Sequence, residues 1–184
     1  YYCLYLYNQG GNHMYDPTVF ENLKVAFENH VYDLDNIERK INIINRTDRM
    51  DFSIIKRDFS IEFVLIDNPA ISAEIIIEAS LEDLAAEILK SPGKNPGCTL
   101  QLKFQKDVMD VPSECKNIEL ALKQIWEGDI TIKQHVSFEY GHLEQNYVNT
   151  TLLSFQQKIN EDNMSEIEDF LASVIESLEL LHDI

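Results

Sequence analysis

The sequence predicts an α+β fold, a two-layer sandwich in which about four helices pack on a mostly antiparallel sheet, within a single domain over residues 1–184. Several short runs alternate apolar and polar residues, and this period of two is typical of strands with one buried face. Other stretches repeat apolar residues at steps of three or four, which predicts helices whose single apolar stripe must be covered by a sheet. Strands joined by short turns pair antiparallel.

The order of elements leaves one further alternative open. The second half of the chain follows the pattern β-α-β-β-α and the first half resembles it, so an internal duplication of this unit is an expectation about architecture, although the two halves do not align in sequence.

The first elements are unevenly defined. Tyr1–Tyr7 has strand character, and residues 1–13 are either poorly packed or a cloning remnant that ends before Met14. Asp16-Pro17 predicts a helix start, with aspartate as the N-cap and proline at the first helical position. The apolar residues of this helix then follow at three- and four-residue steps: Phe20, Leu23, Phe27, Val31 and Leu34.

The next stretch is predicted to be a strand from Lys40 to Arg46, followed by a turn over Thr47-Asp48. Asp51–Arg57 fits either an edge strand or one turn of helix capped by Asp51, because the period of so short an apolar run does not separate the two.

A β-β-α unit occupies the middle of the chain. Its strands are Ser60–Asp67 and Ile71–Ala79, joined by a turn at Asn68-Pro69, where proline removes a hydrogen-bond donor from the ladder. Ser80 is placed to cap the helix that follows. The predicted apolar stripe of this helix is Leu81, Leu84, Ala85, Ile88 and Leu89, and residues 90–93 end it.

The second half continues with a strand over Cys98–Gln105 and a helix that opens at Pro112-Ser113 and closes at Gly128. A strand then runs from Ile130 to Tyr140, and its apolar side is predicted to be Ile132, Val136, Phe138 and Tyr140. After a loop at 141–146, Tyr147–Lys158 returns as a strand. A last helix from about Asn163 carries Ile167, Phe170, Leu171, Val174, Ile175, Leu178 and Leu181.

Composition excludes some classes of function. The net charge of −17 repels nucleic-acid phosphates, so nucleic-acid binding is disfavoured. No apolar run approaches the roughly 20 residues that a membrane-spanning helix needs, so we expect no membrane insertion. Cys3, Cys98 and Cys115 form no disulfide or metal pattern, which predicts a cytoplasmic location.

Basic residues gather in one short span, which predicts either an anion-binding rim or neutralisation of acidic helices within the chain, and we favour neutralisation. The residues of this span are Arg39, Lys40, Arg46, Arg49, Lys56 and Arg57.

Three carboxylates are the candidate ligand or metal site. Glu62, Glu74 and Glu78 are expected on the polar face of the central hairpin, where paired carboxylates could perform acid–base chemistry or hold a divalent cation. No metal-binding spacing accompanies them, and charge on the wet face of a sheet is the ordinary pattern. Solvation is therefore the favoured interpretation.

Other chemically active residues give weaker patterns. His135, Ser137 and Glu139 share a strand face, with His142 in the next loop, but residues two apart on a strand stand too far apart for a reliable proton relay. Cys98 and Cys115 are expected to be buried as small apolar groups. The histidines are scattered and no nucleotide-binding motif occurs, so the sequence predicts no catalytic residues, no metal site and no cofactor.

These observations favour a non-catalytic, acidic protein-binding or regulatory protein, such as a chaperone, adaptor or inhibitor. The alternative is an enzyme or a small-ligand or metal-binding protein that uses the carboxylate-bearing sheet face, and nucleic-acid contact through Arg39–Arg57 is the weakest hypothesis. We expect the partner to be a protein. A homodimer is a further alternative, since the apolar seam of the last helix covers only about two heptads and is better explained by packing on the sheet.

Overall fold

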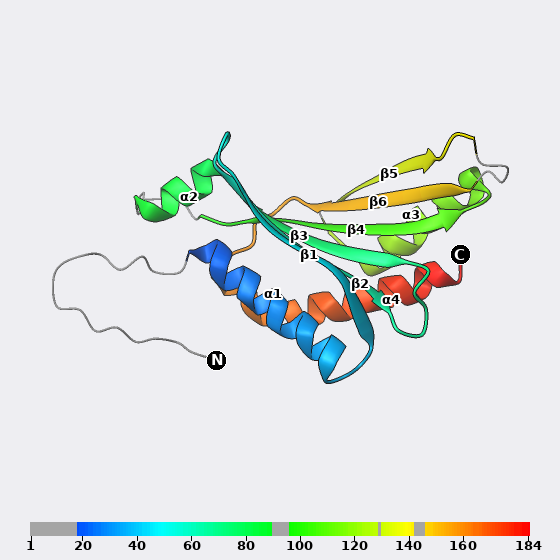
Figure 1. Ribbon diagram of the computed structural model, residues 1–184, viewed down its shortest axis with the longest axis horizontal. Coiled ribbons are helices and arrows are strands. Elements are labelled where there is room, and N and C mark those ends of the chain that lie inside the picture. The colour runs from blue at the N-terminus through cyan, green and yellow to red at the C-terminus, as the bar shows by residue number, and fades with distance from the viewer. Residues whose placement is uncertain (1–17, 90–95, 129, 142–145) are drawn as a thin grey trace.

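The structure is a computed structural model that describes residues 18–89, 96–128, 130–141 and 146–184 (Figure 1). Its elements follow in the order α1 (Val19–Asn36), β1 (Ile41–Asp51), β2 (Lys56–Leu65), β3 (Ser72–Ala79), α2 (Leu81–Ile88), β4 (Thr99–Val108), α3 (Val111–Ile125), β5 (Ile130–Phe138), β6 (Tyr147–Phe155), the 3-10 helix η1 (Glu161–Glu166) and α4 (Ile167–His182).

The six strands form one sheet in the order β1-β2-β3-β4-β6-β5, and every neighbouring pair is antiparallel. Helices α1, α3 and α4 lie against one face of this sheet, whereas α2 extends from its end (Figure 1). The predicted α+β class with an antiparallel sheet is confirmed. The internal duplication stays a prediction.

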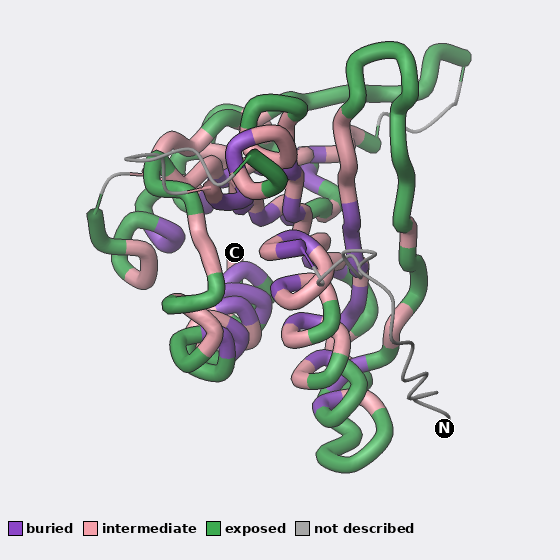
Figure 2. The backbone as a smooth tube through the Cα atoms, turned by 90° about the vertical axis from the view of Figure 1, so that its left-hand side faces the viewer, coloured by how far each residue is buried: buried purple, intermediate pink, exposed green. Residues whose placement is uncertain are grey.

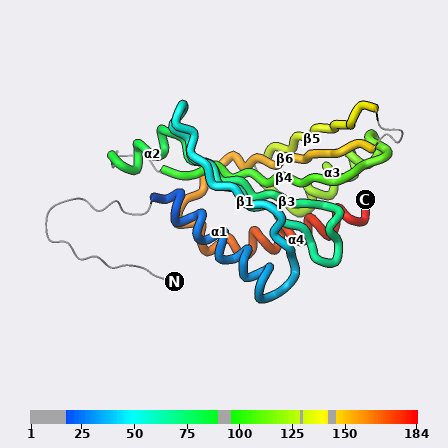
Figure 3. The backbone as a smooth tube through the Cα atoms, in the orientation of Figure 1, coloured from blue at the N-terminus to red at the C-terminus, as the bar shows by residue number. Residues whose placement is uncertain are grey.

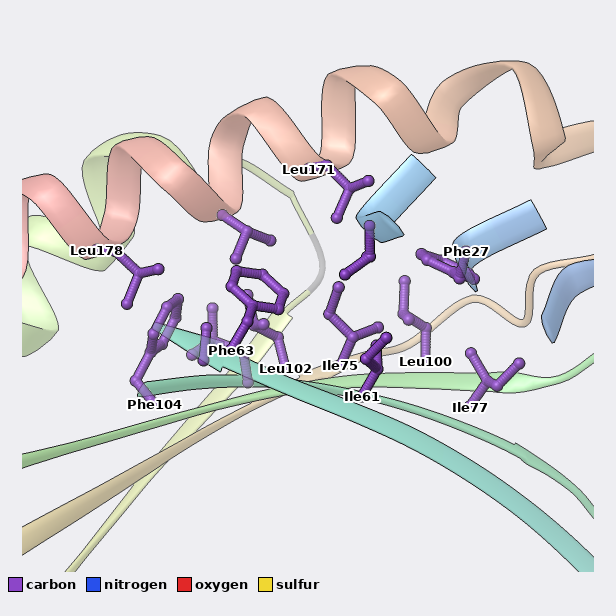
Figure 4. Packing of buried hydrophobic residues seen from close by; sticks show 14 of the residues in the cluster. Phe27, Ile61, Phe63, Ile75, Ile77, Leu100, Leu102, Phe104, Leu171 and Leu178 are labelled. Carbon is purple, nitrogen blue, oxygen red and sulfur yellow. The ribbon is translucent and has the colours of Figure 1, made fainter. Parts of the chain in front are cut away.

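The core lies between the sheet and the three helices. Alternate residues of the central strands point to the helices, so that Ile61 of β2 and Leu102 of β4 both lie opposite Ile75 of β3 (Figure 4). From the helix layer, Leu171 and Leu178 point down onto this surface. Figure 2 shows the buried residues gathered where helices and strands face one another. Alternation in the strands and helical periodicity in α4 therefore produce one continuous core.

Helix α1 starts later than predicted. Thr18 is its N-cap and accepts a hydrogen bond from the backbone N–H of Glu21, so the prediction that Asp16 caps the helix is wrong. The backbone N–H of Val19 donates to a Glu87 carboxylate oxygen of α2 at 3.0 Å, which satisfies a donor that a helix N-terminus leaves free. Asp16-Pro17, Tyr1–Tyr7 and the rest of residues 1–13 lie outside the described residues.

The predicted turn at Thr47-Asp48 is also wrong, because β1 continues to Asp51. Thr47 pairs with Ser60 and Asp48 pairs with Phe59, and their polar side chains are used in contacts rather than in a turn. The reversal lies at residues 52–55, so the ambiguous stretch 51–57 is a hairpin turn with parts of both flanking strands.

The central unit agrees with its prediction in kind and differs at the ends. Strand β2 begins at Lys56 rather than Ser60, and Ser80 caps α2 through a reciprocal hydrogen-bond pair with Asp83. The predicted apolar stripe of α2 is buried only in part. Leu84 packs against the core, whereas Leu81 and Ile88 are exposed, because the helix projects past the end of the sheet.

The elements of the second half are confirmed with shifted ends. Asp110 caps α3 one residue before Val111. On the predicted apolar side of β5, Val136 and Phe138 are 38% and 58% exposed, and Tyr140 beyond its end is 95% exposed. Strand β5 is the last strand of the sheet, and Tyr140 follows its end.

Helix α4 buries one stripe against the sheet, and its buried apolar residues are Ile167, Leu171, Val174, Leu178 and Leu181. Phe170 packs instead in an aromatic cluster with Phe27, Trp126 and Phe155. Among the described residues, no helix combines the length and the apolar character needed to cross a membrane.

Candidate interaction surfaces

The predicted carboxylates are brought together in part. Glu62 and Glu74 lie directly opposite each other on β2 and β3, on the face away from the helices. The Ser72 hydroxyl donates to Glu62 at 2.8 Å, and Lys103 of β4 forms an ion pair with Glu74. Each carboxylate therefore has its own partner in a cross-strand ladder, which offsets the repulsion between two like charges placed opposite each other.

Glu78 lies farther along β3, opposite Asp58, and forms an ion pair with Lys56. Within the described ranges, no group of three or more histidine, cysteine, aspartate or glutamate residues is arranged to hold a metal ion. None of the surface hollows described below is lined by Glu62, Glu74 or Glu78. A ligand or metal role for these three residues stays a prediction.

Two residues of the basic span, Arg46 and Arg57, belong to an ion-pair belt between the β1–β2 hairpin and α1. Residues 46 and 48 of β1 and residue 57 of β2 point toward the helix, and the α1 residues that meet them are spaced by three and four positions, on one helix face. The belt consists of Glu21, Lys24, Glu28, Arg46, Asp48 and Arg57.

Arg57 holds the centre of this belt. Its guanidinium forms ion pairs with Glu21 of α1 and, at 3.3 Å, with Asp48 of β1, and it lies 4.7 Å from the ring centroid of Phe20. Lys24 contacts the same two carboxylates at 2.7 and 2.9 Å. A planar guanidinium suits such a site, because it can donate to two carboxylates and stack on an aromatic ring.

The belt shifts the acidities of its members. Partial burial raises the pKa of Glu21 and of Asp48, but hydrogen bonds and charge attraction from Lys24 and Arg57 outweigh burial, so both pKa values lie below their ordinary range. For Lys24 and Arg57, burial lowers the pKa, yet the facing carboxylates raise it above its ordinary value. All four groups are therefore held in their charged forms near neutral pH.

The remaining basic residues follow the same pattern with one exception. Arg49 pairs with Asp58 at 2.9 Å and Lys40 pairs with Glu38. Arg39 has a backbone φ of 53° and, within the described part of the chain, forms no ion pair. An anion bound along the basic span would have to displace these carboxylates, and the anion-binding rim stays a prediction.

The two described thiols occupy different environments. Cys98 is 1% exposed, and burial, together with the nearby carboxylates Asp83 and Glu87, raises its pKa to about 12, so it is not a nucleophile at neutral pH. Cys115 is half-buried, and its sulfur accepts a hydrogen bond from the Asn149 amide at 3.1 Å.

Asn149 belongs to a buried polar cluster that the sequence did not predict. Its amide also donates to Gln134, whose own amide donates to the backbone carbonyl of Cys115, and its oxygen accepts from the Thr151 hydroxyl. The sequence did hold a signal for this cluster. Gln134, Asn149 and Thr151 are polar, although they occupy strand positions at which β5 and β6 otherwise carry buried or partly buried apolar residues. Every buried side-chain polar atom of the described residues is hydrogen-bonded, so the cluster leaves no group free for a ligand.

The predicted serine–histidine set is not assembled. His135 and Ser137 lie opposite Thr150 and Val148 on the helix-free face of β5 and β6. Glu139 follows the end of β5, and His142 lies outside the described residues.

The turn of the β1–β2 hairpin presents apolar side chains to solvent. Phe52 is 81% exposed and Ile54 is 59% exposed, with Met50 and Ile55 beside them. Asp51 orders the start of the turn, because its carboxylate accepts a hydrogen bond from the backbone N–H of Ser53 at 2.9 Å. We call the exposed residues Met50, Phe52, Ile54 and Ile55 the apolar turn.

A second surface follows α4. One part lies between α4 and the C-terminal part of α1, which are side by side although they stand at opposite ends of the described sequence (Figure 3), and the other part lies between α4 and the β2–β3 turn. Two hollows of about 360 and 540 Å³ share Lys40 and Ile175 and so form one groove. A third hollow of about 650 Å³ shares His30 with the first and continues along α1 to Met164. The apolar side chains in the first two hollows are Leu34, Leu65, Leu171, Ala172 and Ile175.

Acidic residues dominate the rim of these first two hollows, which we call the acidic groove. Its six carboxylates, against Arg39 and Lys40 as the two cations, are Asp33, Glu38, Asp67, Glu168, Glu179 and Asp183. Of these, Glu38 is paired with Lys40, whereas Asp33, Glu168 and Glu179 form no ion pair within the part of the chain that the structure describes.

The sequence held a signal for the acidic groove. Glu168, Ala172, Ile175, Glu179 and His182 repeat at steps of four and three along α4, next to the buried stripe. Only the approach of α1, which is a long-range contact, turns this stripe into a groove.

Compared with known proteins, the chain matches no family model, no curated protein and no solved structure.

Proposed function

We propose that this chain is a non-catalytic protein-binding or regulatory protein and that the apolar turn of the β1–β2 hairpin contacts its partner. The exposure of Phe52 and Ile54 carries this proposal. An apolar side chain that faces water contributes no burial energy to the fold. Contiguous exposed apolar groups typically mark a surface that another molecule covers.

The position of the apolar turn supports recognition. The hairpin extends past Ala79, the last residue of β3, so the turn stands clear of the sheet (Figure 1). Ion pairs hold its base, with Arg49 bound to Asp58 and Lys56 bound to Glu78. A turn presented on a fixed base loses less conformational freedom on binding than a loose loop does.

The charges around the apolar turn favour a protein over a lipid surface. Arg49, Lys56 and Arg57 are each paired with a carboxylate of the chain, so they offer little net attraction to anionic headgroups. The net charge of −17 adds repulsion from an anionic membrane. An apolar site on a protein partner is free of this repulsion. Free thiols at Cys98 and Cys115 agree with the cytoplasmic location that we include in the proposal.

The alternative, an enzyme or small-ligand protein that uses Glu62, Glu74 and Glu78, has less support because each carboxylate is already bonded to a neighbouring side chain.

Site-specific crosslinking tests the proposal. A photoreactive residue replaces Phe52 in one sample and the exposed Ser137 of β5 in the control, in cells that produce the protein. We expect a discrete crosslinked protein only from position 52. With that protein purified, the variant Phe52→Ser, Ile54→Ser should bind at least ten-fold more weakly, because aromatic and branched apolar anchors commonly dominate an interface.

Two outcomes count against the proposal. Equal crosslinking from positions 52 and 137 would show that the turn is not a specific contact. Sedimentation of the protein with phosphatidylcholine or phosphatidylserine vesicles, lost in the double variant, would assign the turn to a membrane surface instead.

A further inference from the structure

We propose that the acidic groove, which α4 forms with α1 and with the β2–β3 turn, binds a basic amphipathic helix of a partner protein. This inference rests on the proposed protein-binding function but not on the apolar turn, which is a separate surface. The groove combines an apolar floor, which includes Leu34, Ala172 and Ile175, with a rim of carboxylates.

The walls of the groove favour a helix over an extended segment. An extended peptide gains affinity from main-chain hydrogen bonds to a sheet edge. Here the smaller hollow is lined largely by side chains of α1 and α4, and the larger one by side chains of α4, the α1–β1 connection and the β2–β3 turn. The α4 stripe from Glu168 to His182 is about 21 Å long at the rise of an α-helix, which accommodates about four turns of a bound helix. Apolar residues on one side of that helix would contact the floor.

The negative charge of the rim predicts that the partner helix is positively charged. Six carboxylates and two cations line the two joined hollows. Asp33, Glu168 and Glu179 form no ion pair among the described residues, although Lys40 attracts Glu179 at longer range. Lysine or arginine residues flanking the apolar side of a bound helix would meet these three. Charge complementarity of this kind supplies specificity and speeds association.

Other occupants fit less well. A second copy of the chain would bring another net charge of −17 against the acidic rim. A metal ion needs converging ligands, and no such group exists in the described part of the chain. An acidic or neutral apolar helix would leave the three carboxylates unpaired.

Peptide binding tests the proposal with defined probes. The first probe is a fluorescent helical peptide of about 18 residues, made of leucine and lysine with the leucines on one face. The second has the same composition in a scrambled order that removes the apolar face, and the third replaces each lysine with glutamate. Fluorescence anisotropy of the full chain with each probe gives the dissociation constants.

We expect the first probe to bind at least ten-fold more tightly than the scrambled probe and the glutamate probe not to bind. Affinity should fall as salt rises, because the rim contribution is screened. The variant Asp33→Asn, Glu168→Gln, Glu179→Gln should lose at least ten-fold in affinity and most of the salt dependence. The variant Ala172→Arg, at an exposed position of the floor, should lose as much.

A matched control separates the groove from net charge. The variant Asp162→Asn, Asp169→Asn, Glu176→Gln makes the same change of charge at exposed positions that line none of the three hollows, and it should bind like the parent. The variant Phe52→Ser should also bind normally, so that loss of the apolar turn and loss of the groove are told apart.

Three results would overturn the proposal: no binding of the leucine–lysine helix, equal binding of the scrambled probe, or an equal loss in the control variant. A dimer in light scattering that Ala172→Arg abolishes would instead place a second copy in the groove.

Discussion

The two sides of helix α1 meet different electrostatic surroundings. On one side, Glu21 and Glu28 face Arg57 and Arg46 of the β1–β2 hairpin, and the ion-pair belt neutralises them. On the other side, Asp33 lies in the acidic groove with Glu168 of α4 and forms no ion pair among the described residues. The strongly negative net charge is therefore not spread evenly: the fold cancels acid where α1 meets the hairpin and leaves it exposed where α1 meets α4.

We expect this difference to separate a structural surface from the interaction surface that we propose. Paired, partly buried charges contribute to stability, whereas unpaired charges of one sign around an apolar floor cost some stability and attract a complementary partner.

Removing the centre of the belt should have the largest effect. Arg57→Ala leaves Glu21 and Asp48 without their arginine and removes the stacking on Phe20, so we expect a loss of about 2 kcal/mol in the free energy of unfolding. Urea denaturation followed by circular dichroism measures it. The control is Arg49→Ala, whose side chain is 71% exposed and whose pairing with Asp58 should contribute less than about 0.5 kcal/mol. Equal losses would show that the belt has no special role.

Acid should weaken the belt next. The pKa values of Glu21 and Asp48 are lower in the folded chain than their ordinary values of 4.5 and 3.8. Their contribution is therefore complete above those ordinary values and is lost as pH falls through the lower, folded values. We expect the free energy of unfolding to decrease by about 1 kcal/mol from this source between about pH 5 and pH 3. This decrease in the free energy of unfolding should be smaller in the variant Arg57→Ala. An equal decrease in that variant would show that Glu21 and Asp48 are not its source.

The outer pair of the belt should contribute less. A double-mutant cycle with Arg46→Ala and Glu28→Ala should give a coupling of about 0.5 kcal/mol that falls in 1 M salt, since the side chain of Arg46 is 39% exposed. Thermal denaturation at two salt concentrations measures the coupling. A coupling that does not respond to salt would mean that packing on Phe59, not charge, holds Arg46 in place.

Neutralising the carboxylates of the acidic groove should have the smallest effect on stability, and it should stabilise the fold rather than destabilise it. Asp33→Asn, Glu168→Gln, Glu179→Gln removes carboxylates that repel one another, so the free energy of unfolding should rise by up to about 0.5 kcal/mol at low ionic strength and by nothing at high salt. The charge-matched variant at Asp162, Asp169 and Glu176 serves as the control. A destabilised groove variant would show that these carboxylates support the fold.

Sequence reasoning succeeded where local pattern reports local structure. Strands β3 and β4 were found because the alternation across Ile71–Ala79 and Cys98–Gln105 is what a half-buried strand requires, and the structure extends β4 to Val108. It failed where distant contacts decide. The polar residues Thr47 and Asp48 resembled a turn, yet Asp48 is drawn into β1 by a cross-strand partner in β2 and by Lys24 of α1.

The candidate surfaces divide in the same way. The placement of Glu62 and Glu74 on the helix-free sheet face followed from period two, and their separate hydrogen-bond partners depended on β4 and on the register of the hairpin. For the acidic groove, the sequence held a signal only on α4; the groove itself could not be predicted, because it requires α1 and α4 to meet across almost the whole described chain.

The strand order also bears on how the chain folds. Strands β1, β2, β3 and β4 follow one another both in the sequence and in the sheet, whereas β6 lies between β4 and β5. Each of the first three pairings links neighbouring strands, but the β4–β6 ladder joins Gln101 to Ser154 and must close a much longer loop. We therefore expect the four-strand meander to form first and the β4–β6 ladder to limit the folding rate. The groove that α4 completes would then exist only after the last step of folding. A partner helix would therefore bind only chains that are completely folded.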